Sequence, residues 1–452
     1  MRNLFKILLL TFCGMVAITS CSDDSDGIPG WPWNDNSTEK PDEPDVAEAK
    51  PRYIWIDAAA NFPDYANSKE NIAKDMEKIK AAGFTDIIVD VRPTTGDVLF
   101  NTNVVDQVKR MDVWGNSGYS YYERTETWDY LQAFIDEARI QGLKVNASIN
   151  TFVGGYLCPY NLGHDGVLFR DESKKGWASV ANLTDGLTNT MDLLDDGVDY
   201  GAKFFNPAND DVQNFVLQLL ADLAKYDLDG INVDFESLSA EAADGYLEFI
   251  RELSIKCENN DIVLSVDNYV PASYNSFYDC GEQAVFADYI VIMAYDEHYN
   301  GSDEGSVASI GFVRQGIEDT LKDVPAEQVI LGVPFYTRVW ELTPVTASDD
   351  QSDQASDEAQ SGYTVSSEVV SMSEVDTRVA TNAVTLQWLD DCGQYYAEYE
   401  HDGKTYKIWV EDQKSIGEKL DVMKNNHLAG ASFWKLGYEK NTIWDTIAEY
   451  MN

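Results

Sequence analysis

Short apolar segments alternate with segments of helical period from residue 53 to residue 451, and this rhythm constrains the fold more than any other feature. Eight segments have the length and apolar content of buried strands: 53–59, 84–91, 143–152, 228–235, 262–270, 289–294, 329–336 and 430–434. Seven segments have helical spacing: 69–82, 128–141, 210–226, 241–257, 311–321, 414–425 and 442–451. Strands that alternate with helices favour a parallel sheet covered by helices. We therefore predict an α/β fold, a single (β/α)8 TIM barrel rather than two domains.

Residues 342–412 interrupt this rhythm between the seventh strand and the seventh helix. The interruption begins with a low-complexity acidic piece, 348–362, for which we expect a loop. Segments 395–399 and 406–410 then alternate polar and apolar residues on either side of His-Asp-Gly at 401–403, a hairpin-turn sequence. These features predict a small α+β insertion in the barrel.

The first twenty residues are typical of a bacterial export signal. Arg2 and Lys6 precede an apolar run, 7–18, that is too short to span a membrane. The run ends in Ile-Thr-Ser-Cys at 18–21, which resembles a lipoprotein cleavage box and implies cleavage before Cys21 and lipidation of its thiol. Ordinary secretion with an incidental Cys21 is the alternative.

Residues 21–51 are rich in Asp, Glu, Pro, Ser and Asn and predict a flexible acidic linker, so that the barrel domain occupies 52–452. The cluster Ser-Asp-Asp-Ser-Asp at 22–26 resembles the surface-export tag of Bacteroidetes lipoproteins, although a plain solvated linker has the same composition. The resemblance implies a surface-exposed outer-membrane lipoprotein; without it, the protein is periplasmic or secreted. Membrane contact is then expected only through the lipid.

Charge and motif content exclude several classes of partner. The chain carries 33 basic and 78 acidic side chains, a formal net charge of -45, which argues against a nucleic-acid partner because phosphate is bound by Lys and Arg.

The cysteines indicate no particular disulfide or metal site. Three full disulfide pairings are possible, and the spacing favours none of them, among Cys158, Cys257, Cys280 and Cys392. No CxxC or HExxH motif is present, so we predict no metal site. We also expect no cofactor, and a monomer.

The strongest chemical signal is the fourth predicted strand, Asp-Gly-Ile-Asn-Val-Asp-Phe-Glu at 229–236. Because alternate side chains of a strand share a face, Asn232, Asp234 and Glu236 should point into the barrel, and the apolar residues between them should pack outward. Glu236 is then nearest the barrel mouth, where active sites of such barrels lie. Two carboxyl groups this close raise one pKa, which suits a general acid. A strand-end acid that caps the next helix is the alternative.

This run resembles the signature of glycoside hydrolase family 18, whose members are (β/α)8 barrels that cleave β-linked N-acetylglucosamine with retention by substrate assistance. The resemblance implies that Glu236 protonates the glycosidic oxygen and that Asp234 orients the 2-acetamido group of the substrate. Asn232 stands where the best-known chitinases have Asp. We expect it to hydrogen-bond Asp234, but it removes one member of the coupled titration.

Other predicted strand ends also resemble family 18. Met-Ala-Tyr-Asp at 293–296 implies that Tyr295 is catalytic and that Met293 and Asp296 contact the sugar. Trp434 would form the floor under the bound sugar. The segment 332–338 resembles a sugar-contacting segment, and its candidate binding residues are Tyr336 and Arg338. The C-terminal region resembles the spore-cortex and peptidoglycan glucosaminidase branch of the family. The resemblance lies in residues 406–412, Ser415, Lys419 and residues 434–437.

The first half of the chain departs from that pattern. Residues 53–100, with Asp-Val-Arg-Pro at 90–93, and residues 205–209 resemble glycosyl-hydrolase-like family 10 barrels. Asp57, Asp90 and Arg92 would lie at strand ends near the mouth, where either fold support by an Asp–Arg pair or substrate contact would explain them.

Three functional hypotheses follow. The first is a hydrolase of N-acetylglucosamine-containing glycans of the chitooligosaccharide, peptidoglycan or N-glycan type. The second is a non-catalytic glycan-binding surface lipoprotein. The third is a glycosidase acting on a sugar without the 2-acetamido group, which substrate assistance cannot cleave.

Overall fold

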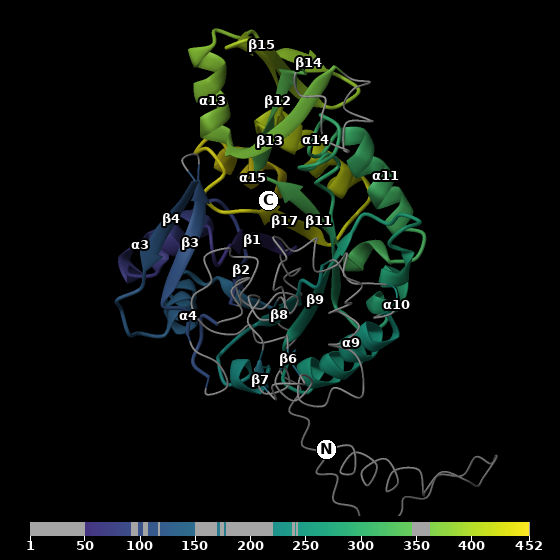
Figure 1. Ribbon diagram of the computed structural model, residues 1–452. Helices are drawn as coiled ribbons and strands as arrows, with labels where there is room; N and C mark the ends of the chain where they lie inside the picture. The colour runs from purple at the N-terminus through teal and green to yellow at the C-terminus, as the bar shows by residue number, and fades with distance from the viewer. Residues whose placement is uncertain are drawn as a thin grey trace, which may run out of the picture. The chain divides into compact units, whose positions relative to one another are not determined.

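Eight parallel strands close into a barrel in the computed structural model, with helices on the outside (Figure 1). The order around the barrel is β1-β17-β11-β10-β9-β8-β5-β2, and β1 closes the ring by pairing with both β17 and β2. The strands are β1 (Arg52–Ile56), β2 (Asp86–Asp90), β5 (Lys144–Ile149), β8 (Gly230–Val233), β9 (Val263–Tyr269), β10 (Tyr289–Met293), β11 (Val329–Pro334) and β17 (Gly430–Trp434). The predicted (β/α)8 fold is therefore confirmed.

The structure describes residues 50–91, 98–102, 107–115, 118–149, 170–171, 176–177, 220–236, 240, 243–345 and 362–451. Several predictions fall outside these ranges: the signal 1–20, Cys21, all of the linker except residues 50 and 51, Arg92, Cys158, most of the helix at 210–226 and most of the acidic loop at 348–362.

The helices begin and end close to their predicted bounds because their ends carry capping residues. The longer ones are α3 (Lys69–Ala81), α4 (Tyr130–Gln141), α9 (Ala243–Glu258), α11 (Ile310–Thr320), α14 (Gln413–Asn425) and α15 (Ile443–Met451); α2 (Phe62–Tyr65) and α10 (Cys280–Ala284) are short. Ser68, Asp129 and Ser309 each accept a backbone N–H of the first turn of their helix. No described helix is long and apolar enough to cross a membrane.

Side chains of each barrel strand alternate between the helices and the barrel interior. The outward residues of β8, Ile231 and Val233, join the large apolar cluster that the helices share. The inward faces of β5 and β8 are polar: Ser148 of β5 and Asn232 of β8 are hydrogen-bonded inside the barrel. This pattern confirms the predicted orientation of the fourth strand and leaves polar groups to line the path toward the mouth.

The insertion is an antiparallel five-stranded sheet in the order β13-β12-β16-β15-β14 (Figure 1). Its elements are β12 (Tyr336–Pro344), β13 (Tyr363–Ser371), α13 (Met372–Thr381), β14 (Gln387–Leu389), β15 (Gln394–His401) and β16 (Lys404–Val410). We predicted that it begins at residue 342, but its first strand begins at Tyr336. The physical reason is that Phe335 still donates its N–H to the barrel residue Trp434, whereas Tyr336 already pairs with Ser371 of β13. Tyr336 and Arg338 therefore belong to the insertion and not to the seventh barrel strand.

A buried ionic network ties the insertion to the barrel. Lys419 of α14 donates to both carboxylate oxygens of Glu411 at 2.9 and 3.0 Å, and the two side chains are 1% and 0% exposed. Gln394 of β15 donates to the same carboxylate, and the backbone N–H of Glu411 donates to Thr337 of β12. Burial raises the pKa of Glu411, and Lys419 opposes that shift. These contacts give Glu411 and Lys419 of the 406–419 segment a structural role in joining the insertion to the barrel.

Two short antiparallel pairs complete the described part of the chain. The hairpin β3 (Arg110–Gly115) and β4 (Gly118–Glu123) lies between β2 and α4, and β6 (Arg170–Asp171) pairs with β7 (Gly176–Trp177). The eight-strand prediction had assigned no structure to the first pair, which belongs to a loop at the C-terminal side of β2.

Candidate active site

Glu236 and Asp234 follow the last residue of β8, on the side of the barrel where all parallel strands end. The backbone N–H of Asp234 still bonds to Ile149 of β5 at 3.1 Å. Phe235, between the two acids, packs outward with ring-centroid distances of 5.6 Å to Tyr246 and 5.3 Å to Phe249 of α9. Because this ring is anchored under the helix, the two carboxyl groups on either side of it face the barrel interior.

Glu236 is held by a tyrosine from the neighbouring strand. The hydroxyl of Tyr269, the last residue of β9, donates to Glu236 Oε2 at 2.8 Å. Burial raises the pKa of the Glu236 carboxyl group; the Tyr269 bond lowers it, and the charge of Asp296 raises it. The net direction is upward, which favours the protonated form that a general acid needs.

Asp234 is half-buried, like Glu236, and its carboxyl group is incompletely bonded. Its Oδ1 atom has no hydrogen-bond partner among the described residues. Burial raises the pKa of Asp234, and the charges of Glu236, Asp267 and Asp90 add to that shift. A buried acceptor without a partner costs free energy, so this oxygen is suited to accept a donor from a ligand.

Asn232 has partners other than the one we predicted. Its Nδ2 donates to Asp267 Oδ1 at 3.0 Å and to Ser265 Oγ at 3.1 Å, while its Oδ1 accepts from Ser148 at 2.8 Å. These contacts use both amide hydrogens, so Asn232 does not donate to Asp234. The predicted loss of a coupled acid is offset by Asp267, which is 3% exposed and whose pKa burial raises to about 8.

Sequence reasoning missed Asp267 and Tyr269. The signal was present, because Ser265, Asp267 and Tyr269 alternate with apolar or outward residues along β9 and so share its inner face. An acid in the middle of a buried strand is uncommon, since burying an unpaired charge is costly. The residue type was visible in the sequence, but its proximity to Glu236 depends on the pairing of β8 with β9.

The end of β10 brings Tyr295 and Asp296 to the same cluster. Burial raises the pKa of the Tyr295 hydroxyl, with contributions from Asp267, Glu236, Asp234 and Asp296, so Tyr295 lies among all four acids. Gly332 of β11 permits this position, because a Cβ atom there would lie 2.6 Å from the Ile292 carbonyl oxygen and 3.2 Å from the Tyr295 ring. Met293, predicted to contact substrate, is the last residue of β10 and is 9% exposed.

Asp296 connects the barrel to the insertion. Its backbone adopts a φ of 56°, a left-handed conformation that is uncommon for a residue with a side chain. The hydroxyl of Tyr336 donates to Asp296 Oδ1 at 2.6 Å, and Arg338 Nη2 lies 3.9 Å from the same oxygen. Three of the predicted binding residues therefore meet, although two of them come from β12 of the insertion.

Trp434 ends β17 on the inner face of the barrel. Its ring packs edge-on against Trp55 of β1 with centroids 5.3 Å apart, and Trp55 donates its indole N–H to Ser432 at 3.0 Å. The peptide bond between Trp434 and Lys435 is cis. The Trp55 ring supports the Trp434 indole, which can serve as a platform for the apolar face of a sugar.

For Asp57 and Asp90, the sequence allowed two roles, fold support and substrate contact. Asp57 Oδ1 accepts the backbone N–H of Ala59 at 2.9 Å and that of Ala60, so its carboxylate caps the turn after β1. This favours fold support for Asp57. Asp90 ends β2 and adds to the charge around Asp234, while its predicted partner Arg92 lies outside the described residues.

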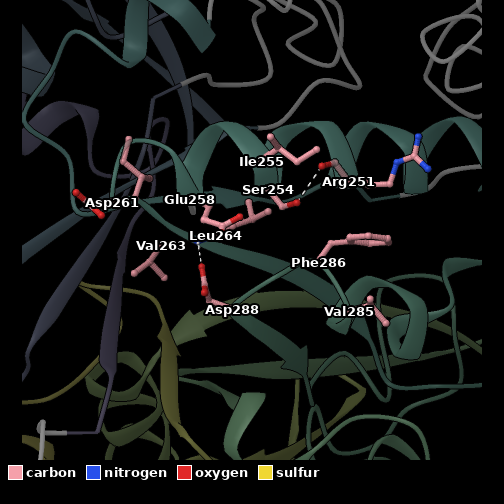
Figure 2. Close-up of a pocket in the computed structure, with 11 residues that line it drawn as sticks. Arg251, Ser254, Ile255, Glu258, Asp261, Val263, Leu264, Val285, Phe286 and Asp288 are labelled. Carbon is pink, nitrogen blue, oxygen red and sulfur yellow. Dashed lines mark hydrogen bonds between the residues drawn. The ribbon is translucent and has the colours of Figure 1, made fainter. Parts of the chain in front are cut away.

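An open groove of about 760 Å³ lies at the other end of the barrel, between α9 and α10 (Figure 2). Its lining includes Val263, the first residue of β9, and Asp288, which precedes β10. Asp288 accepts the backbone N–H of Leu264 at 2.7 Å, a contact within the barrel wall. This groove is therefore separate from the acidic cluster.

Solved structures with the same architecture are (β/α)8 chitinases and cortex-lytic enzymes. The spore cortex-lytic enzyme SleL of Bacillus megaterium has a TM-score of 0.59 at 17% identity, covering 89% of this chain and 74% of that one. A chitinase of Chromobacterium violaceum has a TM-score of 0.57 at 16% identity, covering 89% and 99%. At such low identity these likenesses show the fold alone, a (β/α)8 barrel.

The chain belongs to the glycosyl hydrolases family 18, whose model matches residues 195–439. A cortical fragment-lytic enzyme of Bacillus subtilis is 24% identical over 243 residues, 52% of this chain and 52% of that protein. The uncharacterized glycosylase YvbX of the same organism is 25% identical over 283 residues, 60% and 74%. The chain spans about half the length of several curated relatives it matches. The family match begins at residue 195 and leaves the resemblance of residues 53–100 to family 10 barrels untested.

Proposed function

We propose that this protein is a retaining glycoside hydrolase that cleaves β-linked N-acetylglucosamine glycans by substrate assistance. The observation that carries the proposal is the buried Asp234 Oδ1, which lacks a partner among the described residues, two residues before Glu236. A pocket that uses the substrate as nucleophile needs an acceptor for the acetamido N–H beside a general acid. The names of the SleL and cortical fragment-lytic relatives and the family membership support the same class.

The reaction begins when Glu236 gives its proton to the glycosidic oxygen and the bond to the anomeric carbon breaks. The acetamido carbonyl oxygen of the substrate attacks that carbon and forms an oxazolinium ring. Asp234 accepts the acetamido N–H at its unpartnered Oδ1, and this preorganised acceptor stabilises the positive charge that develops on the group. Glu236, now ionised, takes a proton from water, which opens the ring with net retention.

Substrate contacts follow from the groups around the acids. The Tyr295 hydroxyl, within the cluster, donates to the acetamido oxygen and aims it at the anomeric carbon. Trp434 stacks on the apolar face of the sugar, and Met293, the last residue of β10, contacts the sugar as well. The carboxylate of Asp296, positioned by Tyr336 and Arg338, accepts sugar hydroxyls.

Product analysis on chitooligosaccharides, peptidoglycan fragments and N-glycans tests the proposal, with Glu236→Gln as the matched variant. We expect wild-type protein to release N-acetylglucosamine products and the variant to lose at least about 100-fold in kcat, a typical contribution of general acid catalysis. Equal turnover in both proteins would contradict the assignment of Glu236. Binding without product would instead support a glycan-binding lipoprotein, and turnover of glycans without acetamido groups would support another glycosidase.

A further inference from the structure

The backbone carbonyl of Phe235, between the two acids of the site, accepts a hydrogen bond from a tyrosine hydroxyl. The pairing of β8 with β9 ends at Val233 and Val266, so Phe235 lies beyond the last contact between these two strands. Tyr278 donates its hydroxyl to the Phe235 carbonyl oxygen at 2.9 Å, and both residues are buried. A buried carbonyl group needs a donor. The Tyr278 hydroxyl therefore holds the backbone between the two acids where strand pairing no longer does.

The ring of Tyr278 also supports the tyrosine that contacts Glu236. The rings of Tyr269 and Tyr278 pack edge-on, with centroids 5.8 Å apart and an interplanar angle of 90°. The hydroxyl of Tyr269 donates to Glu236 Oε2 at 2.8 Å. Two hydroxyl groups from one stretch of chain, 269–278, therefore hold the proposed general acid. One binds its carboxyl group, and the other binds the backbone of the residue before it.

The turn that carries Tyr278 is braced from several elements. It includes η2 (Ser276–Tyr278), a short 3₁₀ helix between β9 and α10. The buried Gln283 of α10 donates to the backbone carbonyl of Tyr278 and exchanges hydrogen bonds of 2.8 and 3.2 Å with Asn268 of β9. The Tyr278 ring also packs on Tyr246 of α9, with centroids 5.9 Å apart. Because β9, α9 and α10 all contact this turn, its hydroxyl is a preorganised donor.

We propose that Tyr278 is a positioning residue for the reaction: it fixes the Phe235 backbone and supports Tyr269, and so places the Glu236 carboxyl group against the glycosidic oxygen. This inference rests on the proposed function of Glu236 as the general acid. In this role Tyr278 acts through Glu236 and does not touch the substrate. A general acid must lie within hydrogen-bond reach of the oxygen that it protonates, and a displacement of about 1 Å can cost about 100-fold in rate.

The leaving group of the substrate separates placement of the acid from a general structural role. A sugar leaving group needs a proton from Glu236, whereas dinitrophenolate is a weak base that leaves without one. Tyr278→Phe keeps the ring and removes the hydroxyl. We expect its kcat/KM to fall about tenfold on chitooligosaccharides and to stay within about twofold of wild type on a dinitrophenyl chitobioside. A substitution that only loosens the site would lower kcat/KM on both substrates.

Two further variants calibrate this comparison. Glu236→Gln removes the acid itself and should show the same dependence on the leaving group, with a larger loss. Tyr274→Phe is the matched control, because Tyr274 lies in the same connection after β9 but is 79% exposed, and it should match wild type on both substrates. Glu236→Gln without this dependence would overturn the proposed function. If Glu236→Gln shows it, an equal loss on both substrates in Tyr278→Phe, or no loss, would overturn the role of Tyr278.

The free energy of unfolding reports on the two hydroxyl groups without any substrate. Tyr269→Phe, Tyr278→Phe and the double variant form a double-mutant cycle. Because both hydroxyls hold the same segment, we expect the double variant to lose less stability than the sum of the single losses. Wild-type protein that hydrolyses neither substrate would overturn the proposed function. In that case, additive losses would overturn the hold of Tyr278 on this segment as well, and non-additive losses would support it.

Discussion

Single residues in the site are set by contacts between neighbouring strands. Among the described residues, Tyr269 donates to Glu236, and that bond opposes the effect of burial on the pKa of Glu236. Asp234 keeps an oxygen without a described partner, and Asn232 is saturated. The balance between protonated and ionised carboxyl groups therefore depends on two residues of β9 as much as on the Asp-x-Glu sequence itself.

Tyr269→Phe removes the hydroxyl that stabilises ionised Glu236. The pKa of Glu236 should then rise, and the alkaline limb of kcat/KM should move up by about one pH unit, because a hydrogen bond to a charged group contributes about 1.5–3 kcal/mol. The pH profile measures this shift.

Tyr274→Phe is the matched control, since Tyr274 follows the same strand but is 79% exposed. Its profile should coincide with that of wild type. A downward shift of the limb in Tyr269→Phe would contradict the described hydrogen bond.

At the scale of elements, the barrel strands and most helices were predictable because each has a strong local period and clear end signals. The boundary between the seventh barrel strand and the insertion was not predictable from the sequence. The run from Val329 to Tyr336 is apolar throughout, and only hydrogen bonding shows that the barrel strand ends at Pro334 and that β12 begins at Tyr336. The buried pair of Glu411 and Lys419 was visible only as a pattern of residue types, and its role in joining β16 to α14 required the structure.

Lys419→Met tests this junction. Removing the ammonium leaves Glu411 buried without its partner, which typically destabilises a protein by about 3–5 kcal/mol. The free energy of unfolding from denaturant titration should fall by that order, and the double variant Lys419→Met/Glu411→Met should recover much of the loss.

Lys322→Met is the control, because Lys322 lies on the surface with a 68% exposed side chain. We expect no measurable change for it. Equal stability of Lys419→Met and wild type would show that the pair does not hold the insertion to the barrel.

For the whole molecule, acidic groups dominate the electrostatics, with a net charge of -45. The buried acids Asp86, Asp234, Glu236, Asp267 and Glu411 all have raised pKa values, with burial as the first cause. Each binds a proton more tightly when folded than when unfolded. Stability from these groups is therefore fully present below their unfolded pKa values of about 4 and is lost as the pH rises toward the folded values.

The melting temperature should accordingly be higher at about pH 5.5 than at about pH 8.5, the reverse of what paired surface carboxylates produce. Differential scanning calorimetry measures it. Added salt should raise the melting temperature more at the higher pH, because it screens the repulsion among ionised acids. A melting temperature that increases from the lower to the higher pH would contradict the raised pKa values.

The sequence by itself determined the alternation of strands and helices, the inward direction of Asn232, Asp234 and Glu236, and the family, because these depend on local period and on a contiguous motif. Only the tertiary structure decided which side chains from other strands meet those acids. Asp267 and Tyr269 lie more than thirty residues from their partners on β8. The parallel pairing of β8 with β9 and its register bring them together, and no single segment of the chain encodes that pairing.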